Sequence, residues 1–347
     1  MDLISLLRFL IVLSVLIFVH EGGHFLFAKL FGVAVEEFGF GLPPRVWGRK
    51  IGGTIYSINL LPIGGFVRLK GEEGETLGFA AADSFAIKSK IKRVAIIAAG
   101  ALGNFLLAWL TFSVLLGVGT EVPAGAALVE EVVSQSPASS VGIAVGDRII
   151  SFAGEKVETA DELVGLIDEN RGKSTVLEYE RDGVKREVTV APRIDPLPGE
   201  GSLGVVVSSV AHEKVPWWKT PFSSFYYTAR YLSGMVEGFW KALSNAFRGE
   251  PTVIGGPVAI FALSQAAASG GVDVFLQFMA LLSLNLVVVN LIPIPALDGG
   301  RILFIALEAL RGKKLSPRVE RAFNSLGFAF LLFLIVLLSI RDIRTFF

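Results

Sequence analysis

Residues 3–30 read LISLLRFLIVLSVLIFVHEGGHFLFAKL, an apolar run that is long enough to cross a lipid bilayer. Crossing takes about 20 mostly apolar residues, whereas the apolar core of a cleaved signal peptide has only about 7–15. No A-x-A cleavage site ends the run. The sequence therefore predicts a transmembrane helix here, with a signal peptide as the alternative.

Three further apolar runs, at residues 94–120, 274–297 and 322–340, carry no charged side chain. Together with residues 3–30 they predict four transmembrane helices. The composition agrees, because 52% of the residues are hydrophobic and only 18% are charged, against about 25% charged in an ordinary soluble domain. This balance, with a formal net charge of zero, argues against a wholly soluble protein, a disordered chain and a nucleic-acid-binding protein.

The charges between these runs predict which side of the membrane each connection occupies. Residues 29–93 carry ten Lys and Arg against six Asp and Glu, and residues 299–321 carry six against two. Residues 121–273 carry thirteen against twenty. Because cytoplasmic loops are rich in Lys and Arg, the first two connections are expected in the cytoplasm. Residues 121–273 and both chain termini are then expected outside.

An H-E-x-x-H pattern formed by His20, Glu21 and His24 lies inside the first run. Residues i and i+4 of a helix share a face, so both imidazoles can bind one Zn²⁺. Glu21 would then lie beside the open metal position, where it can take a proton from water. Ionisable groups within a membrane are costly and usually functional; the alternative is a polar helix end that reaches the interface. Gly22 and Gly23 weaken a helix but allow close approach of a neighbouring helix or of substrate backbone.

A catalytic zinc site needs a third protein ligand. The chain has no Cys and only three His, and His212 lies in the segment expected outside, so a carboxylate at the depth of His20 and His24 is the expected ligand. Residues 290–300 read NLIPIPALDGG, where two prolines end the helix and place Asp298 in a Gly-rich turn at the cytoplasmic end. Asp298 can therefore meet both imidazoles; its alternative role is to cap a helix.

Residues 35–70 alternate and turn like β-structure, directly after the helix that carries the metal motif. A small hairpin sheet beside an active site could hold an unwound substrate as an additional strand. We expect Gly64, Gly65, Phe66 and Val67 to contact the substrate in this way. An ordinary cytoplasmic hairpin domain is the alternative.

Residues 122–210 are expected to form an α/β domain. The predicted strands are residues 127–133, 148–152, 176–181 and 184–190, and the predicted helix is residues 159–168. The stretch SPA at 136–138, followed by VGIAVGDRII at 141–150, looks like the signature of bacterial PDZ domains, which bind extended peptides. Residues 202–205 are the expected peptide-holding loop and strand; a domain that serves only as a steric plug is the alternative.

Residues 211–271 are expected to form interfacial amphipathic helices or linker helices. Large aromatic side chains are dense in this region, and such side chains suit a helix that lies at a membrane surface. They are Trp217, Trp218, Phe222, Phe225, Tyr226, Tyr227, Tyr231, Phe239 and Trp240. A linker helix packed beneath the PDZ-like domain is the alternative.

The motifs HEGGHFLFAKLFGV and NLIPIPALDGG resemble those of the site-2 protease family of intramembrane zinc metalloproteases, in its bacterial RseP-type branch, the sigma-E regulator proteases. The likeness also covers VEEFGFGLPPRVW, SFAIKSKIKRVAIIAAGALGNFLLA and GGPVAIFALSQAA. It implies that His20, His24 and Asp298 bind Zn²⁺ and that Glu21 is the catalytic base.

The same resemblance implies that asparagines of the third span, here Asn290 and Asn285, hold substrate backbone. Hydrogen bonds between helices are the alternative role for both. The chain departs from the family at Ala101, where many members have Pro, and in having one expected external PDZ module where the best-known relatives have two. The second departure bears on how the size of substrates is screened.

The sequence thus predicts an α-helical membrane protein with four transmembrane helices, a cytoplasmic-side re-entrant β-hairpin sheet and one external PDZ-like α/β domain. The expected parts are residues 1–120 with the first two spans and the sheet at 35–70, residues 122–210, residues 211–271, and residues 272–347 with the last two spans.

The resemblance implies a zinc endopeptidase of a bacterial inner (cytoplasmic) membrane, with its active site towards the cytoplasm. Its expected substrates are single-span membrane proteins, such as anti-sigma factors already trimmed outside, or remnant signal peptides. The lipid bilayer is the other expected partner, and nucleic acid is not. A catalytically silent PDZ scaffold is the main alternative, but a scaffold does not need a base such as Glu21. A zinc carrier would call for metal-binding side chains on more of the spans.

Overall fold

The structure is a computed structural model that describes residues 3–72, 82–196, 200–250, 255–313 and 316–346. The chain divides into two compact units. Unit 1 contains residues 1–115 and 217–347, and unit 2 contains residues 116–216. Unit 2 is therefore inserted in the sequence between the two halves of unit 1.

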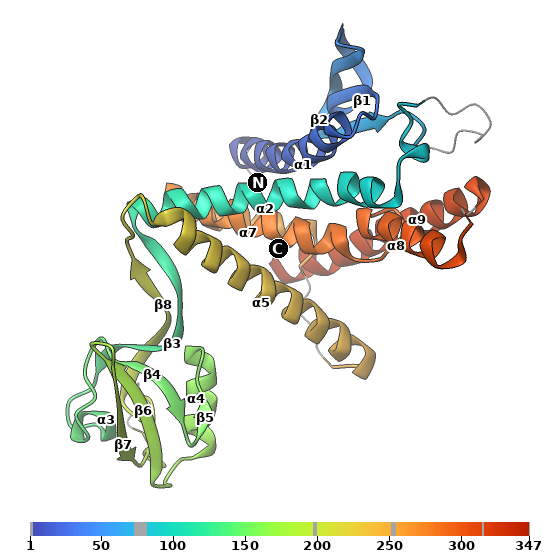
Figure 1. Ribbon diagram of the computed structural model, residues 1–347. Helices are drawn as coiled ribbons and strands as arrows, with labels where there is room; N and C mark the ends of the chain where they lie inside the picture. Colours follow the sequence, from blue (N-terminus) through green and yellow to red (C-terminus); the bar gives the residue numbers. More distant parts are fainter. Residues whose placement is uncertain (1–2, 73–81, 197–199, 251–254, 314–315, 347) are drawn as a thin grey trace. The chain divides into compact units, whose positions relative to one another are not determined.

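Among the residues that the structure describes, four helices are long and apolar enough to cross a membrane. They are α1 (Leu3–Leu30), α2 (Lys90–Val118), α7 (Val272–Leu291) and α9 (Pro317–Phe346) (Figure 1). A helix suits the hydrocarbon region because its backbone N–H and C=O groups are paired within the segment. Each helix lies where the sequence predicts a span.

The third span is shorter than predicted, because α7 ends at Leu291 and not at residue 297. Pro293 and Pro295 follow, and proline lacks the N–H that a helix needs and restricts the residue before it. A new helix, α8 (Asp298–Arg311), begins directly after them. The expectation that Asp298 lies in a turn is therefore wrong in detail, since Asp298 is the first residue of α8.

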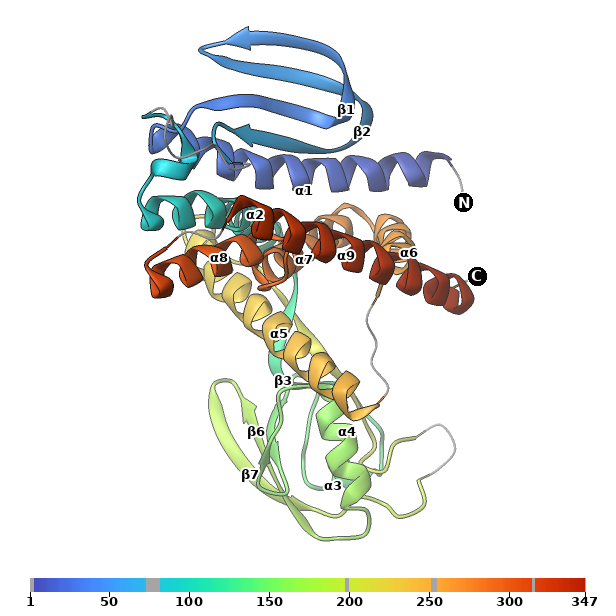
Figure 2. The ribbon, with the colours of Figure 1, turned by 90° about the vertical axis from the view of Figure 1, so that its right-hand side faces the viewer.

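The sheet predicted for residues 35–70 is present and consists of β1 (Val35–Ile51) and β2 (Thr54–Leu69). The antiparallel strands join at Gly52 and Gly53, whose φ angles of +56° and +86° suit a tight hairpin turn. Both strands fold over, so that residues 35–40 of β1 pair with residues 65–69 of β2 on one side and with residues 55–58 on the other. Residues 65–69 are thus an outer edge. Figures 1 and 2 show the sheet beside α1, on the side away from α2.

A buried carboxylate organises this sheet. Glu37 is 3% exposed, and Arg45 donates to its two oxygens from Nε at 3.0 Å and from Nη2 at 2.6 Å. Burial favours the neutral acid, but hydrogen bonds from Ser57 and Arg45 and the charges of Arg45 and Arg68 hold the pKa of Glu37 below its usual range. The charge on Glu37 therefore stays paired inside the sheet. The position of the sheet relative to a membrane remains a prediction.

Two helices, α5 (Thr220–Arg248) and α6 (Pro257–Ser269), lie in the region predicted to be helical at 211–271, but its first residues, up to Glu213, belong to a strand, β8 (Val205–Glu213). One face of α5 packs inward, since the ring of Tyr231 stacks on Phe112 of α2 with centroids 5.1 Å apart. Other aromatics of the region, including Trp218 and Phe222, are exposed. The location of α5 in a membrane interface remains a prediction.

The core of unit 1 nearest the metal motif joins segments from both halves of the chain. It contains residues of α1, β1, β2, the short 3₁₀ helix η1 (Phe85–Ile87), α2 and α8. Its buried members are Ala28, Val33, Val35, Leu69, Phe85, Ile96, Ile97 and Ile305. Packing of these apolar side chains holds α8 beside the end of α1.

Unit 2 is an antiparallel sheet with two helices. The strands are β3 (Thr120–Val132), β4 (Arg148–Phe152), β5 (Glu155–Lys156), β6 (Thr175–Arg181), β7 (Val184–Val190) and β8 (Val205–Glu213), and the helices are α3 (Pro137–Ser140) and α4 (Ala160–Glu169). The sheet order is β7-β6-β4-β3-β8, with β5 on β4. The four predicted strands and the predicted helix are confirmed. Thr159 and Glu162 cap the start of α4 reciprocally.

A buried ion pair stabilises unit 2. Asp147 is fully buried and accepts from Arg181 Nε at 2.6 Å, from Arg181 Nη2 at 2.7 Å and from the backbone N of Ala144 at 2.9 Å. Since hydrogen bonds to charged groups contribute about 1.5–3 kcal/mol, Asp147→Ala is expected to lower the free energy of unfolding of unit 2 by about 2–3 kcal/mol.

Thermal unfolding of the full-length chain in detergent, with hydrogen exchange read out on residues of unit 2, measures this change. Asp168→Ala is the matched control, because its pair with Arg171 is exposed and such pairs contribute less than about 1 kcal/mol. Equal losses in the two variants would contradict a stabilising role for the buried pair.

Candidate metal centre

Helix α1 brings the two imidazoles of the H-E-x-x-H motif together. His20 and His24 are each 7% exposed, and their Nε2 atoms lie 3.2 Å apart. The other ring nitrogen of His24, Nδ1, lies 2.9 Å from the backbone O of Ile96 on α2. A bond from Nδ1–H to that carbonyl leaves the Nε2 lone pair of His24 free for a metal.

Asp298 meets both imidazoles at the start of α8. Its Oδ2 lies 3.0 Å from His20 Nε2 and 3.3 Å from His24 Nε2. The three ligand atoms thus form a nearly equilateral triangle. Tetrahedral zinc with bonds of about 2.0–2.1 Å requires ligand atoms about 3.3 Å apart. Two imidazole nitrogens and one carboxylate oxygen at this spacing fit a zinc ion with one further position for water.

Glycines allow α2 to approach this triangle closely. A Cβ on Gly23 would lie 2.0 Å from the backbone O of Ala99, and a Cβ on Gly100 would lie 2.4 Å from His24 Nε2 and 2.7 Å from His20 Cε1. Neither position can accept a side chain without displacing the helices or the imidazoles. The predicted close helix approach is confirmed at Gly23, whereas a Cβ on Gly22 would meet no described atom within 4 Å.

Glu21 is held by the outer edge of the sheet. Its Oε2 accepts a hydrogen bond from the backbone N of Val67 at 3.1 Å. The adjacent turn packs on α1, because a Cβ on Gly64 would lie 3.1 Å from Ile17 and one on Gly65 would lie 3.9 Å from Cγ of Glu21. The base candidate and the strand edge predicted to contact substrate are therefore neighbours.

A cavity of about 180 Å³ lies at this junction. Its lining combines the titratable groups of the motif with the strand edge and the start of α8. The lining residues are Glu21, His24, Phe66, Val67, Leu69, Glu72, Ile96, Ile97, Asp298 and Arg301. A small enclosed space of this kind limits water around Glu21 and the triangle.

The two predicted asparagines are not among the residues that line this cavity. Asn285 is exposed on α7, and Asn290 is half-buried in the last turn of that helix. Sequence reasoning missed Glu72 and Arg301. Arg301 was accessible in principle, since it follows Asp298 by one helical turn, but its partner Glu72 is remote in sequence and carries no motif.

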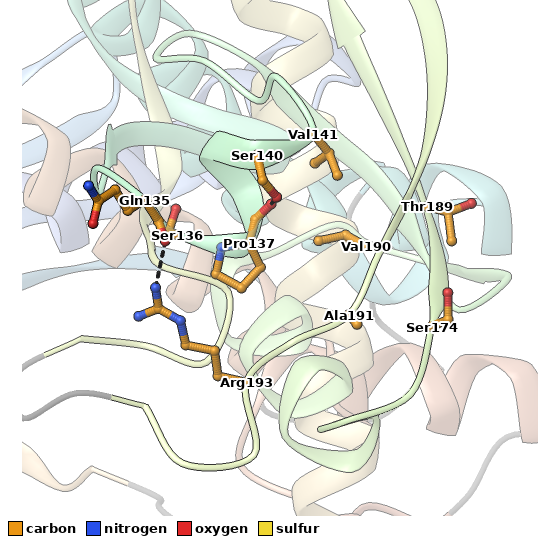
Figure 3. A pocket seen from close by; sticks show the side chains of 10 residues that line it. All are labelled: Gln135, Ser136, Pro137, Ser140, Val141, Ser174, Thr189, Val190, Ala191 and Arg193. Carbon is orange, nitrogen blue, oxygen red and sulfur yellow. Dashed lines mark hydrogen bonds between the residues drawn. The ribbon is translucent and has the colours of Figure 1, made fainter.

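Unit 2 has a hollow of its own, with a volume of about 480 Å³ (Figure 3). Hydroxyl groups of Ser140 and Thr189 and apolar groups of Pro137 and Val190 line it, and Arg193 donates from Nη2 to the backbone O of Gln135 at 2.7 Å. The expected peptide-holding residues 202–205 are not among its lining residues.

Comparisons with known proteins agree with this arrangement of residues. The model of the family described as Peptidase family M50 matches residues 8–334. The zinc metalloprotease RasP of Geobacillus kaustophilus (strain HTA426) is 30% identical over 428 residues, which cover 99% of this chain and 98% of that protein. The regulator of sigma-W protease RasP of Bacillus subtilis (strain 168) is 28% identical over 423 residues, with 99% of each chain covered.

Among solved structures, the PDZ domain of the SdrC-like protein of Listeria monocytogenes is similar to 25% of this chain and 90% of that chain, with 17% identity and a TM-score of 0.22. The family match, by contrast, extends over most of the sequence and includes both metal motifs. The chain therefore belongs to peptidase family M50, the site-2 protease family, and is an intramembrane zinc metalloprotease.

Proposed function

We propose that His20, His24 and Asp298 hold the catalytic zinc and that Glu21 is the general base of an endopeptidase that cleaves transmembrane segments. The observation that carries this proposal is the triangle of ligand atoms, with sides of 3.0, 3.2 and 3.3 Å. A structural zinc site would have four protein ligands, whereas three leave the open position that catalysis requires.

Bound zinc supplies Lewis acidity, which polarises a carbonyl and makes a water molecule acidic near neutral pH. Glu21 takes the proton of that water and delivers it to the leaving amine. The backbone N–H of Val67 orients the carboxylate of Glu21 for this transfer. The cavity walls formed by Phe66, Ile96 and Ile97 reduce the access of bulk water.

We infer that the substrate segment unwinds and adds as an extended strand to the outer edge of β2 at residues 64–66, because the N–H groups of Val67 and Leu69 already donate to Glu21 and Glu72. A helical peptide encloses its own carbonyls, and an extended one exposes them. Gly64, Gly65, Phe66 and Val67 lie at this edge next to α1, which supports their predicted role. Asn290 is half-buried at the end of α7 and remains a candidate for holding substrate backbone, and exposed Asn285 is a weaker one.

The proposed substrates are single-span membrane proteins. One relative is named a regulator of sigma-W protease, and this name supports anti-sigma-factor-like substrates that have been shortened outside; remnant signal peptides form a second class. The Lys- and Arg-rich connections support an active site towards the cytoplasm, with unit 2 and both termini outside, and the bacterial relatives support a bacterial cytoplasmic membrane. The PDZ-like unit would then contact peptide, or exclude large external domains.

The proposal is tested with purified full-length protein in liposomes and a single-span model substrate. We expect cleavage within the transmembrane segment, loss of cleavage to background with a zinc chelator, and recovery when zinc is restored. A silent scaffold would bind the substrate without cleaving it under any of these conditions. A soluble protein without an apolar segment is the matched control and should remain intact.

A further inference from the structure

An ion pair crosses the wall of the cavity beside the proposed metal centre. The guanidinium Nη2 of Arg301, on α8, donates to Oε1 of Glu72, which follows β2. The side chains of Arg301 and Glu72 are 32% and 14% exposed. Both line the cavity that also contains Glu21, His24 and Asp298. The mechanism proposed above gives this pair no role.

On one side the pair is tied to a metal-ligand candidate. Arg301 follows Asp298 by three residues in α8, and residues i and i+3 share a helix face. The start of α8 is itself fixed by backbone contact: a Cβ on Gly299 would lie 2.2 Å from the O of Ile292, and one on Gly300 would lie 2.3 Å from the O of Ile294. Asp298 and Arg301 are therefore carried by the same closely packed first turn of α8.

On the other side the pair is tied to the strand that holds the base. Oε2 of Glu72 accepts from the backbone N of Leu69 at 3.2 Å, two residues beyond Val67, which donates to Glu21. The next N–H, that of Lys70, points the other way and donates to the O of Ala34 at 2.9 Å. The N–H groups of Val67 and Leu69 thus lie on the same outer edge. The carboxylate of Glu21 accepts from Val67, and the carboxylate of Glu72 accepts from Leu69.

We propose that the Arg301–Glu72 pair is a positioning element that keeps the metal-ligand helix α8 and the base-holding edge of β2 in alignment. Arg301, three residues after Asp298 in α8, pairs with Glu72, and Glu72 accepts from the strand edge that also donates to Glu21. Glu21 lies on α1 beside His20 and His24, which contact Asp298. The inference rests on the proposed roles of Glu21 and Asp298. Neither Arg301 nor Glu72 takes part in proton transfer.

A general anchor for α8 would have different consequences, and the chain offers a control for it. Glu308, near the other end of α8, pairs with Arg93 of α2 at 2.5 Å, with side chains 12% and 9% exposed. Loss of this pair loosens α8 without touching the cavity. Glu308→Gln is therefore expected to lower the melting temperature while it leaves kcat and the metal environment close to those of the parent protein.

The test is a double-mutant cycle of Glu72→Gln and Arg301→Gln in the full-length zinc protein. Partners that orient a metal ligand typically change activity or metal affinity by about 10–100-fold when removed, so each variant is expected to lower kcat by about that factor, with KM within about twofold. The double variant is expected to resemble the single ones, because either change breaks the same contact. Arg301→Lys keeps the positive charge but not the planar guanidinium, so its kcat should lie between those of the parent protein and of Arg301→Gln.

A second readout does not depend on cleavage. In cobalt(II)-substituted protein, the visible absorption bands report ligand geometry, and we expect them to shift in both single variants and to stay unchanged in Glu308→Gln. The proposal would be overturned if both single variants kept the parental kcat and unshifted cobalt bands. It would also be overturned if the fold-loss of kcat in the double variant equalled the product of the fold-losses in the two single variants. If the parent protein itself fails to cleave, the proposed function fails, and the cobalt bands still decide whether the pair aligns the centre.

Discussion

Replacement of Glu21 by glutamine is expected to abolish measurable proteolysis while zinc stays bound. The glutamine side chain has the same size and still presents an oxygen to the N–H of Val67, but it cannot take a proton from water. Since general base catalysis typically contributes about 10²–10⁴-fold, cleavage should fall by at least that factor. The measurement combines a single-turnover cleavage assay with metal analysis of the same preparation.

The matched control for this variant is Glu36→Gln, which removes a carboxylate of the same type from an exposed position in β1. It should retain parental activity and zinc. Residual cleavage by the Glu21 variant within tenfold of the parent would remove Glu21 from the role of base. Loss of zinc in that variant would mean that Glu21 contributes to binding the metal and would contradict the assignment made here.

Asp298→Asn is expected to weaken zinc binding by more than about 100-fold, because the loss of even an outer partner of a metal ligand costs about 10–100-fold. The amide oxygen of asparagine carries no negative charge to offset the charge of the zinc ion. Among the described residues, Asp298 is the one carboxylate in the triangle of possible ligands. Competition with a chromophoric chelator measures the change, and cleavage should fall in parallel when zinc is limiting.

Asp273→Asn is the control for this second variant, since Asp273 is exposed in the first turn of α7. It should bind zinc as the parent protein does. Equal zinc stoichiometry after chelator treatment of parent and Asp298→Asn would exclude Asp298 from the ligand set. A melting temperature close to that of the parent would show that the change acts on the site and not on folding.

Much of the architecture was predictable because its signals are local. Long uncharged runs gave α2 and α9, and alternation with turn residues gave the sheet at 35–70. The strands and the helix of unit 2 were equally accessible, since short apolar strands and a helical period are local patterns. In each case the residues that determine the element lie inside it.

Errors arose where an element depends on its neighbours. Residues 290–297 are apolar enough to extend the span, but Pro293 and Pro295 end α7, and α8 starts at a position that sequence alone made a turn. Strand β8 was anticipated only at its first residue, because its partner β3 is remote in the sequence. No local pattern reveals such pairing.

The candidate site shows the same division. The spacing of His20 and His24 is a property of one helix and needs no tertiary information. The contribution of Asp298 depended on the resemblance as well as on depth in the membrane, and the contact of Glu21 with Val67 required the folded sheet. Glu72 was invisible because its role depends on Arg301, which lies on another helix.

The insertion of unit 2 between the two halves of unit 1 has a consequence for biosynthesis. The proposed ligands are separated in the sequence by the whole of unit 2, so the imidazoles are translated before it and the aspartate after it. A nascent chain emerging from the ribosome can therefore display the H-E-x-x-H helix in the bilayer for a long time with its ligand set incomplete. On the proposed ligand set, such a chain cannot assemble the metal triangle until α8 has been synthesised.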